Sequence, residues 1–542
     1  MSQTKQPTNT GALATLVTVF FFWGFIAASN GIFIPFCKKF FQLTQFESQL
    51  IDTAFYGAYY IGSYILFLST VLTKVDILNK IGYKKGIILG LFISIAGAIL
   101  MIPAVNAGGI DATGSYSGAF PYILGAFFVI ALGFSLQQTS AQPFAIALGD
   151  PSTGSHRLNL AGSVNSFGTT IGPLIVSVVL FGSIAEGAAG AADIGQIRFL
   201  YTIVAGVFLL AALIFMFSKK LPNLSFEEHV EASPKALMSL TALTLGLGVI
   251  IAIGQATDLS KLSLSSFALA LVFIVLAISY MMASKSNDGW GAMKYPQLIL
   301  GMFGIFTYVG VEVTIQSNMG ALLKLPEFGA YDESHMSQFI SLYWGSLMIG
   351  RWTAAISVFN LSRTMKRVLT FVVPFAAFAL ILLINAGRGN DVSMLYLYPI
   401  CIAVLIAGIF FGQEKPMKTL MTLALLAAAA MILGMVSTGM VSIYAFLAGG
   451  LFCSVMWPCI FSLGLAGLGK YTSEGSAFLV MMILGGAVIP PFQGALADVV
   501  NIHMSYIVPI VCFLFLAFLA WKIKDVLSKQ GLDFDTQIGG GH

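Results

Sequence analysis

Runs of about twenty apolar residues recur along the whole of this 542-residue chain, separated by short polar connections. A helix of that length crosses the roughly 30 Å of hydrocarbon in a bilayer. Only 9% of the residues are charged, whereas about 25% are charged in an ordinary soluble domain. Because so little charge cannot coat a water-facing surface, the sequence predicts an all-α polytopic membrane protein that lies in a lipid bilayer.

We predict sixteen spans, counted from the apolar windows. They cover residues 12–35, 51–73, 85–104, 119–148, 159–182, 198–218, 236–255, 264–284, 297–322, 337–360, 367–386, 394–411, 418–437, 441–468, 475–498 and 504–523.

Lys and Arg mark one side of this predicted bundle. The connections "TKVDILNKIGYKKG", "SKKLPN" and "SRTMKR" are basic, whereas "NAGGIDATGSYSG" and "GSIAEGAAGAADIG" carry neither Lys nor Arg. Lys38–Lys39 is the exception, on a connection assigned to the second side. Basic connections face the cytoplasm, so the even span count predicts that both termini are cytoplasmic. The short polar start, without a small-residue cleavage site, predicts no removable signal peptide.

Two segments of the chain repeat each other. "PFAIALG" (143–149) returns as "PCIFSLG" (458–464), and "GTTIGP" (168–173) returns as "GGAVIP" (485–490). From the first Pro to the last is 30 residues in one copy, 143 to 173, and 32 in the other, 458 to 490. The order and spacing predict two parallel halves, each built around a similar pair of helices.

Parallel six-helix repeats are the architecture of the major facilitator superfamily, so we predict that fold with two pseudo-symmetric halves and two extra hairpins. The predicted division is 1–220 for the first half, 221–295 for a linker with one hairpin, 296–526 for the second half, and 527–542 for a cytoplasmic tail. The second hairpin lies within 367–437, and the sequence leaves open which two of the three spans there are extra.

Several motifs resemble the fucose permease family, the bacterial fucose/glucose/galactose:proton symporter branch of the major facilitators. They are "FFFWGFIAASNGIFIP", "HRLNLAGSVNSFGTTIGP", "YVGVEVTIQS", "YWGSLMIGR", "LQQTSAQPF" and the stretch Leu451–Asp498. The resemblance covers nearly all twelve core helices of that family. It implies a secondary transporter of a neutral sugar and a bacterial inner-membrane location.

Two positions depart from the fucose permease. Where that permease carries a membrane Asp this chain has Gly31, and where it carries a Glu this chain has Gln138. Glucose/galactose-type relatives also resemble this chain in having Gln there, so Gln138 favours that subgroup. Gly31 departs from both, and it weakens any proton route carried over from the permease.

Amides and aromatic rings inside the spans are the candidates for sugar binding. Amides both donate and accept hydrogen bonds, as sugar hydroxyls do, and polar groups in hydrocarbon must find partners. The candidate substrate-binding residues are Asn30, Gln138, Gln142, Asn165, Gln316 and Trp457. The alternative for each amide is that it joins helices, as Gln and Ser often do in membrane bundles.

Charged residues inside a membrane mark function by default. The candidate coupling residues are Glu312 and Arg351, which lie well within spans, and Asp52 near the mouth of the second span. Relatives of the glucose/galactose type resemble this chain at Glu312. The hypothesis is that Glu312 takes up and releases a proton; the alternative is a permanent Glu312–Arg351 ion pair, and Asp52 is alternatively a helix cap.

The candidate gating residues are basic and lie on predicted cytoplasmic connections. "NKIGYKKG" resembles the loop between the second and third spans of major facilitators, which helps the halves close on the inside, and "HRLN" begins the fifth span. The residues chosen are Lys80, Lys84, Lys85 and Arg157.

The predicted function is import of a neutral monosaccharide, such as glucose, galactose or fucose, together with a proton; sodium coupling and facilitated uniport stay open. A sugar sensor and an exporter are further alternatives. No phosphate-binding GxxxxGK[ST] motif supports ATP-driven transport, and no hydrolase motif supports an enzyme. The five cysteines lack metal-site spacing, so no metal or cofactor is expected. We expect a monomer and no nucleic-acid partner.

Overall fold

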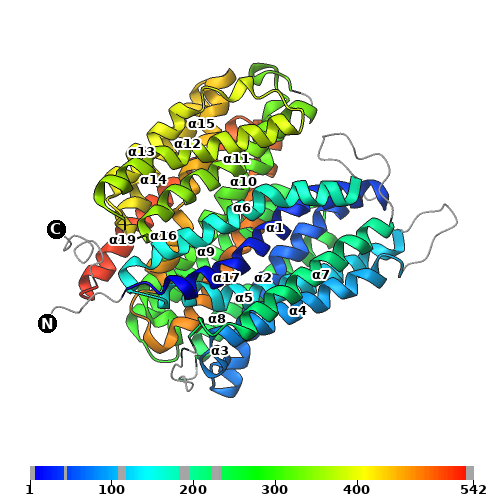
Figure 1. Cartoon of the computed structure of the whole chain (residues 1–542). Coiled ribbons are helices and arrows are strands. Elements are labelled where there is room, and N and C mark those ends of the chain that lie inside the picture. The colour runs from blue at the N-terminus through cyan, green and yellow to red at the C-terminus, as the bar shows by residue number, and fades with distance from the viewer. Residues whose placement is uncertain are drawn as a thin grey trace.

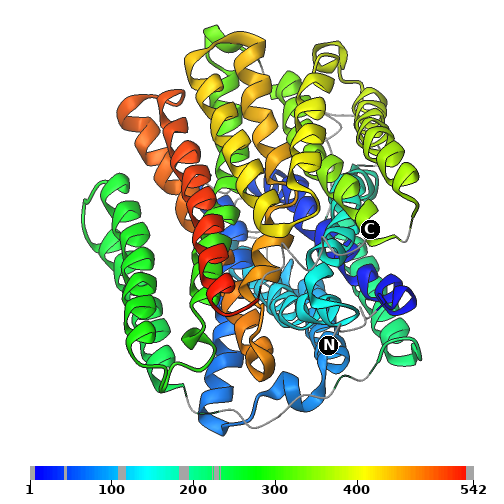
Figure 2. The same cartoon turned by 90° about the vertical axis from the view of Figure 1, so that its left-hand side faces the viewer.

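The protein is a bundle of long helices. The computed structural model describes residues 7–41, 45–107, 117–181, 194–222, 224, 231, 233–331, 333–359 and 361–532, and within them the chain is helical without strands. Helix α1 (Thr10–Phe40) begins and helix α19 (Ile507–Lys529) ends at the same end of the bundle, on the left in Figure 1 and facing the viewer in Figure 2. We call this the terminal end.

The helices up to residue 217 are called the first half. They are α1 Thr10–Phe40, α2 Gln45–Thr73, α3 Ile77–Ile81, α4 Tyr83–Ala104, α5 Phe120–Ala147, α6 Gly154–Phe181 and α7 Ile194–Phe217.

A hairpin of two helices follows, and the helices from residue 296 onward are called the second half. The hairpin is α8 Pro234–Ala256 and α9 Lys261–Lys285, and the second half is α10 Pro296–Leu323, α11 Glu333–Ala355, α12 Arg363–Gly387, α13 Pro399–Gly412, α14 Pro416–Val436, α15 Gly439–Cys453, α16 Met456–Gly464, α17 Thr472–Met481, α18 Gly485–Val500 and α19 Ile507–Lys529.

Each predicted span falls on one of these helices or on a consecutive pair. In the described part of the chain, fourteen segments are long and apolar enough to cross a membrane. The predicted spans 159–182 and 337–360 coincide with α6 and α11, which are not among the fourteen, so the count of sixteen stays a prediction.

The repeated prolines shape equivalent helices in the two halves. A proline has no N–H to give to the carbonyl four residues earlier, so Pro143 frees the carbonyl of Thr139 and Pro458 frees that of Ser454. The Thr139 carbonyl accepts a bond from the Ser476 hydroxyl at 2.8 Å. The Ser454 carbonyl accepts one from Nε of Arg351 at 3.1 Å, at the break between α15 and α16. Both prolines therefore expose a backbone acceptor that another helix uses.

The repeated glycines also act alike. A Cβ added at Gly168 of α6 would lie 2.3 Å from the backbone oxygen of Phe21 in α1. A Cβ at Gly485, at the start of α18, would lie 1.8 Å from the backbone oxygen of Phe306 in α10. In both halves a glycine thus lets two helix backbones touch, which confirms that the halves are built alike.

The α8–α9 hairpin lies beside both halves, as the green pair in Figure 2 shows. On one side, the hydroxyls of Tyr60 and Tyr64 in α2 lie 2.8 and 2.7 Å from those of Thr244 and Thr241 in α8. On the other side, the ring of Phe273 in α9 packs on rings of α10 and α19. The hairpin therefore covers the outer seam between the halves.

Candidate functional site

An ion pair joins α10 and α11 in the interior of the second half. Nη2 of Arg351 lies 3.4 Å from Oε1 of Glu312, and each side chain is 12% exposed. Nη2 also donates to the Tyr308 hydroxyl at 3.3 Å, while the Tyr343 hydroxyl donates to the backbone oxygen of Glu312 at 2.6 Å. The sequence picked out both charged residues, and the structure brings them together.

The same arginine reaches the first half. Nη1 of Arg351 donates to the Ser166 hydroxyl of α6 at 3.0 Å. The Ser163 hydroxyl, one turn earlier in α6, donates to the backbone oxygen of Arg351 at 2.8 Å, and the indole of Trp352 donates to the Ser163 carbonyl at 3.2 Å. These hydrogen-bond partners of Arg351 among the described residues therefore come from both halves, and Arg351 links the ion pair to the interface between them.

Aromatic rings lie next to the ion pair. The Trp457 ring centroid lies 6.1 Å from that of Tyr308, and Trp457 stacks on Phe461 at 5.6 Å. Trp457 is half-buried, so part of its side chain is exposed. Gln316 is also half-buried and lies one turn from Glu312 along α10, on the same face.

The predicted amides of the first half serve different purposes. Nε2 of Gln138 donates to the Tyr59 hydroxyl at 3.1 Å, and Nδ2 of Asn165 donates to the backbone oxygen of Phe20 at 2.9 Å. Gln142 is 5% exposed, and its Oε1 has no partner among the described residues.

Gln137, beside Gln138, joins helices. It accepts a bond from the Trp23 indole at 2.9 Å and donates to the Ser94 hydroxyl at 3.0 Å. Trp23 is 3% exposed, so its indole N–H bonds within the first half. The side chains of Asn30 and Asp52 lie outside the described residues, so these two predictions have no structural placement.

Polar bonds cross between the halves at the terminal end. The Ser473 hydroxyl donates to Oδ1 of Asp76 at 3.1 Å, and Nδ2 of Asn79 donates to the Lys470 carbonyl at 3.0 Å. Burial raises the pKa of Asp76 above its ordinary value, although the bonds from Asn79 and Ser473 oppose the rise. Together with the Ser476–Thr139 bond, these contacts close the interface at that end.

The predicted gating residues occupy the same end. Lys80 and Lys85 are exposed, and Nζ of Lys84 donates to the Ser218 carbonyl within the first half. Arg157 is buried and donates to the carbonyls of Ala145, Ile146 and Asp150 at 2.6–2.8 Å, so it caps the end of α5.

The crossing contacts of Asp76, Ser473 and Ser476 were missed by the sequence reasoning. Their signal in the sequence is small: Asp76 accepts from the Asn79 N–H as an ordinary helix cap. A further contact at this end joins Nε2 of His156 in α6 to the carbonyl of Glu414, before α14, at 3.2 Å.

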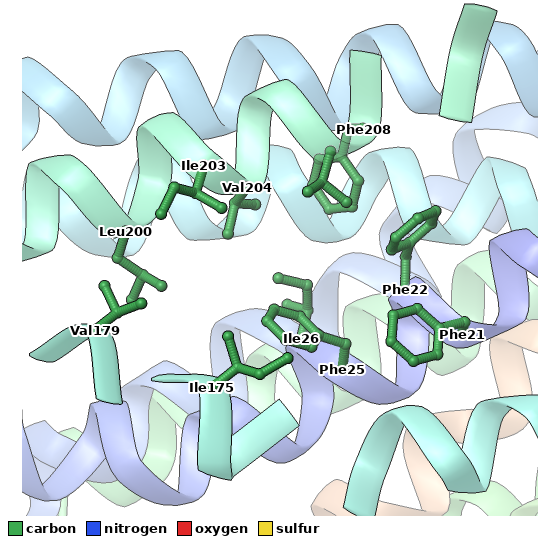
Figure 3. Close-up of a pocket in the computed structure, with 11 residues that line it drawn as sticks. Phe21, Phe22, Phe25, Ile26, Ile175, Val179, Leu200, Ile203, Val204 and Phe208 are labelled. Carbon is green, nitrogen blue, oxygen red and sulfur yellow. The ribbon is translucent and has the colours of Figure 1, made fainter. Parts of the chain in front are cut away.

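An apolar cavity of about 270 Å³ lies between α1, α6 and α7. Figure 3 shows Phe22 and Ile26 of α1 facing Val204 and Phe208 of α7. All its lining residues are apolar, so it offers no partner to a sugar hydroxyl. The polar groups around Arg351 are therefore the candidate site, and none of them lines the cavity.

Comparison with known proteins shows the family of this chain. No protein-family model matches it. It is 30% identical to a glucose/galactose transporter of Brucella abortus, over 95% of each chain. The chain belongs to the fucose/glucose/galactose permease family of the major facilitators. As a member of this permease family it is a multi-pass membrane transporter and not an enzyme.

Other relatives agree with this membership. The permease chain is 25% identical to the L-fucose-proton symporter of Escherichia coli, over 92% of this chain and 90% of that one. Among solved structures, the Escherichia coli fucose:proton symporter has a TM-score of 0.63 at 22% identity, covering 95% of this chain and 99% of that one. The structural likeness shows that the fold is the major facilitator fold.

Proposed function

We propose that this permease imports a neutral monosaccharide, a hexose or 6-deoxyhexose such as glucose, galactose or fucose, by alternating access and together with a proton. The named relatives, a glucose/galactose transporter and an L-fucose-proton symporter, support the substrate class. In major facilitators the substrate lies near the membrane midplane between two halves that rock against each other.

The observation that carries the proposal is the position of Arg351. It pairs with Glu312 inside the second half and at the same time bonds Ser166 of the first half. A proton taken up by Glu312 removes the negative partner of the guanidinium, and the arginine must then redistribute its bonds. Because one of those bonds crosses the interface, the charge of Glu312 is tied to the contact between the halves.

The sugar site is assigned to polar and aromatic groups around this pair. Trp457 and Tyr308 supply ring faces for the apolar face of a pyranose, and Gln138 and Asn165 supply amides from the first half. The free Oε1 of Gln142 is a buried acceptor that a ligand hydroxyl or water would satisfy.

Orientation follows from the basic connections. We assign the terminal end to the cytoplasm of a bacterium, with the protein in the inner membrane as a monomer. The contacts of Asp76, Asn79 and Ser476 then close the cytoplasmic side, so the structure corresponds to the outward-facing conformation.

The packing of the second half supports one choice for its extra hairpin. In the first half α4 packs on α5 and α7, and in the second half α14 packs on α15 and α19 in the same way. Helices α12 and α13 pack outside α11 and α14. We therefore assign α12–α13 as the inserted hairpin within 367–437, and α8–α9 as the insertion between the halves 1–220 and 296–526.

Uptake by purified protein in liposomes tests the proposal. With a pH gradient, radiolabelled glucose, galactose or fucose should accumulate above its external concentration. The variant Glu312→Gln should still exchange sugar but lose accumulation, whereas Glu327→Gln, at an exposed glutamate, should behave as the native protein. Accumulation by Glu312→Gln would eliminate Glu312 as the coupling group, and failure to exchange any hexose would eliminate the sugar assignment.

The second candidate is facilitated uniport or sodium symport. It is favoured by Gly31 and Gln138, which are uncharged where the fucose permease has acidic residues. Exchange of labelled sugar without accumulation would identify a uniporter, and accumulation driven by sodium alone would identify a sodium symporter.

A further inference from the structure

A buried carboxyl group at the terminal end has no assigned role. Glu474 lies in the first turn of α17 and is 4% exposed. Its Oε1 accepts a bond from the backbone N–H of Ala292 at 3.1 Å and lies 3.5 Å from the Ser233 hydroxyl. Its Oε2 has no partner among the described residues.

The surroundings are shaped to hold this group. Ser233 directly precedes α8 and Ala292 follows α9, so Oε1 connects α17 to both ends of the α8–α9 hairpin. Gly291 takes a φ of +52°, and a Cβ there would lie 2.4 Å from Oε1. The absence of a side chain at Gly291 therefore leaves room for the Glu474 carboxyl group to approach the backbone.

The charges around Glu474 do not favour a second anion. From the first half, Asp76 in the α2–α3 connection acts on it with the same sign. From the stretch after α9, Lys294 acts with the opposite sign, but its Nζ lies 4.3 Å from the Tyr471 ring centroid, over that ring. The contact with α5 is polar and uncharged, from Ser476 to the Thr139 carbonyl.

A buried carboxylate with one bare oxygen is far more costly than the neutral acid. We propose that Glu474 is a proton-binding site of the gate, by which we mean the contacts of Asp76, Asn79 and Ser476 that close the terminal end. Glu474 is neutral while the halves are closed at that end and ionised once they part. Opening brings the carboxyl group into contact with water at that end, and water stabilises the charged form.

This proton is not the transported one. Glu474 is buried in the closed gate and, when the gate opens, it meets only the solution at the terminal end. It therefore returns each proton to the side from which it came, and it shifts the balance between closed and open states without carrying a proton across. This step rests on the proposed alternating-access function. Where the open state is ionised and the closed state neutral, the closed-to-open ratio should rise about tenfold for each unit fall in pH.

Distances between the halves test the proposal without any transport measurement. Spin labels are placed on the exposed residues Lys85 of α4 and Lys529 at the end of α19, as K85C and K529C in full-length protein whose native cysteines are replaced. Pulsed electron–electron double resonance in detergent measures the distance between the two labels from acid to alkaline pH, and the distance distribution gives the closed fraction. The native side chain should give a closed fraction that falls as pH rises, whereas Glu474→Gln should stay closed over the whole range.

Asp76→Asn is the control for a second buried acid at this end. It removes a like charge near Glu474, so it should shift the closed fraction but leave its fall with rising pH in place. The same slope in Glu474→Gln as in the native protein, or a slope abolished only by Asp76→Asn, would overturn the assignment. If Glu474→Gln does not fold, the native protein alone tests the proposal. Its infrared difference spectrum between acid and alkaline pH should contain a carboxylic-acid band whose intensity follows the closed fraction. A closed fraction independent of pH would refute the proposal. A protein that transports no sugar leaves this result unchanged, so the two failures are distinguishable.

Discussion

Replacing the repeated glycines by alanine should separate the helices that carry the site. At Gly168 the new Cβ would lie 2.3 Å from the Phe21 oxygen, and at Gly485 it would lie 1.8 Å from the Phe306 oxygen. Ordinary contact begins at 3.4 Å, so α6 would move from α1 by about 1.1 Å and α18 from α10 by about 1.6 Å if the helices part along these contacts. The obstacle is backbone, which cannot rotate away as a side chain can.

Overpacking of this kind costs about 1–3 kcal/mol for a side chain that yields, and a backbone contact belongs at or above the upper end of that range. We therefore expect Gly168→Ala and Gly485→Ala each to destabilise the fold by about 3 kcal/mol or more. Gly168→Ala should also weaken sugar binding, because Asn165 lies one turn away and would move from the Phe20 oxygen it bonds.

Thermal unfolding in detergent, with sugar binding on the same samples, measures both effects. The matched controls are Gly125→Ala in α5 and Gly206→Ala in α7, where an added Cβ meets nothing within 4 Å. Because alanine is the better helix former, these two should be stabilised by about 0.5–1 kcal/mol. If Gly168→Ala unfolds at the temperature of the controls, the close backbone contact of α1 and α6 is wrong.

Three further predictions concern single bonds. Trp23→Phe leaves Oε1 of the buried Gln137 without its donor and should lower stability by about 1–3 kcal/mol, as seen by thermal unfolding; no change would refute the bond. Gln138→Glu puts an ionisable group beside Tyr59 and should change the pH profile of sugar uptake from that of the native protein; superimposable uptake profiles would exclude a role for this position. Asn79→Ala removes a crossing bond worth about 0.5–1.5 kcal/mol and should raise the open fraction at the terminal end about two- to tenfold, measured with the same spin labels; an unchanged fraction would show that this bond does not hold the gate.

The fold could be predicted from the sequence because its signals are local and repeated. Apolar windows of membrane-spanning length fix the class, and the recurrence of Pro143 as Pro458 and of Gly168 as Gly485 fixes the two-fold plan. Each of these residues acts on the backbone next to it, by removing a donor or a side chain. A local pattern can therefore be interpreted without knowing the partner.

The site could be predicted only in part. Glu312 and Arg351 are charged residues within apolar spans, and charge in a membrane demands a partner, so their meeting follows from few alternatives. The gate gives no such signal. Asp76 and Ser473 are 397 residues apart, each is an ordinary residue at a helix start, and only the docking of the halves brings them together. The partner of Gln137 is equally hidden, because nothing in the sequence marks which tryptophan faces it.

The amide at Gln138 changes the direction of a hydrogen bond as well as a charge. A carboxylate at this position would accept the hydrogen of the Tyr59 hydroxyl, which would then be fully engaged. The Gln138 amide instead donates to the Tyr59 oxygen at 3.1 Å, so the tyrosine keeps its own hydrogen to give. Exchanging the acid for an amide therefore removes a proton site from the first half and adds a hydroxyl donor to it. A transporter with this pair can bind a sugar oxygen through Tyr59 at any pH and must place its titrating group elsewhere, which is why Glu312, held by Arg351 at the interface, is the residue to test first for coupling.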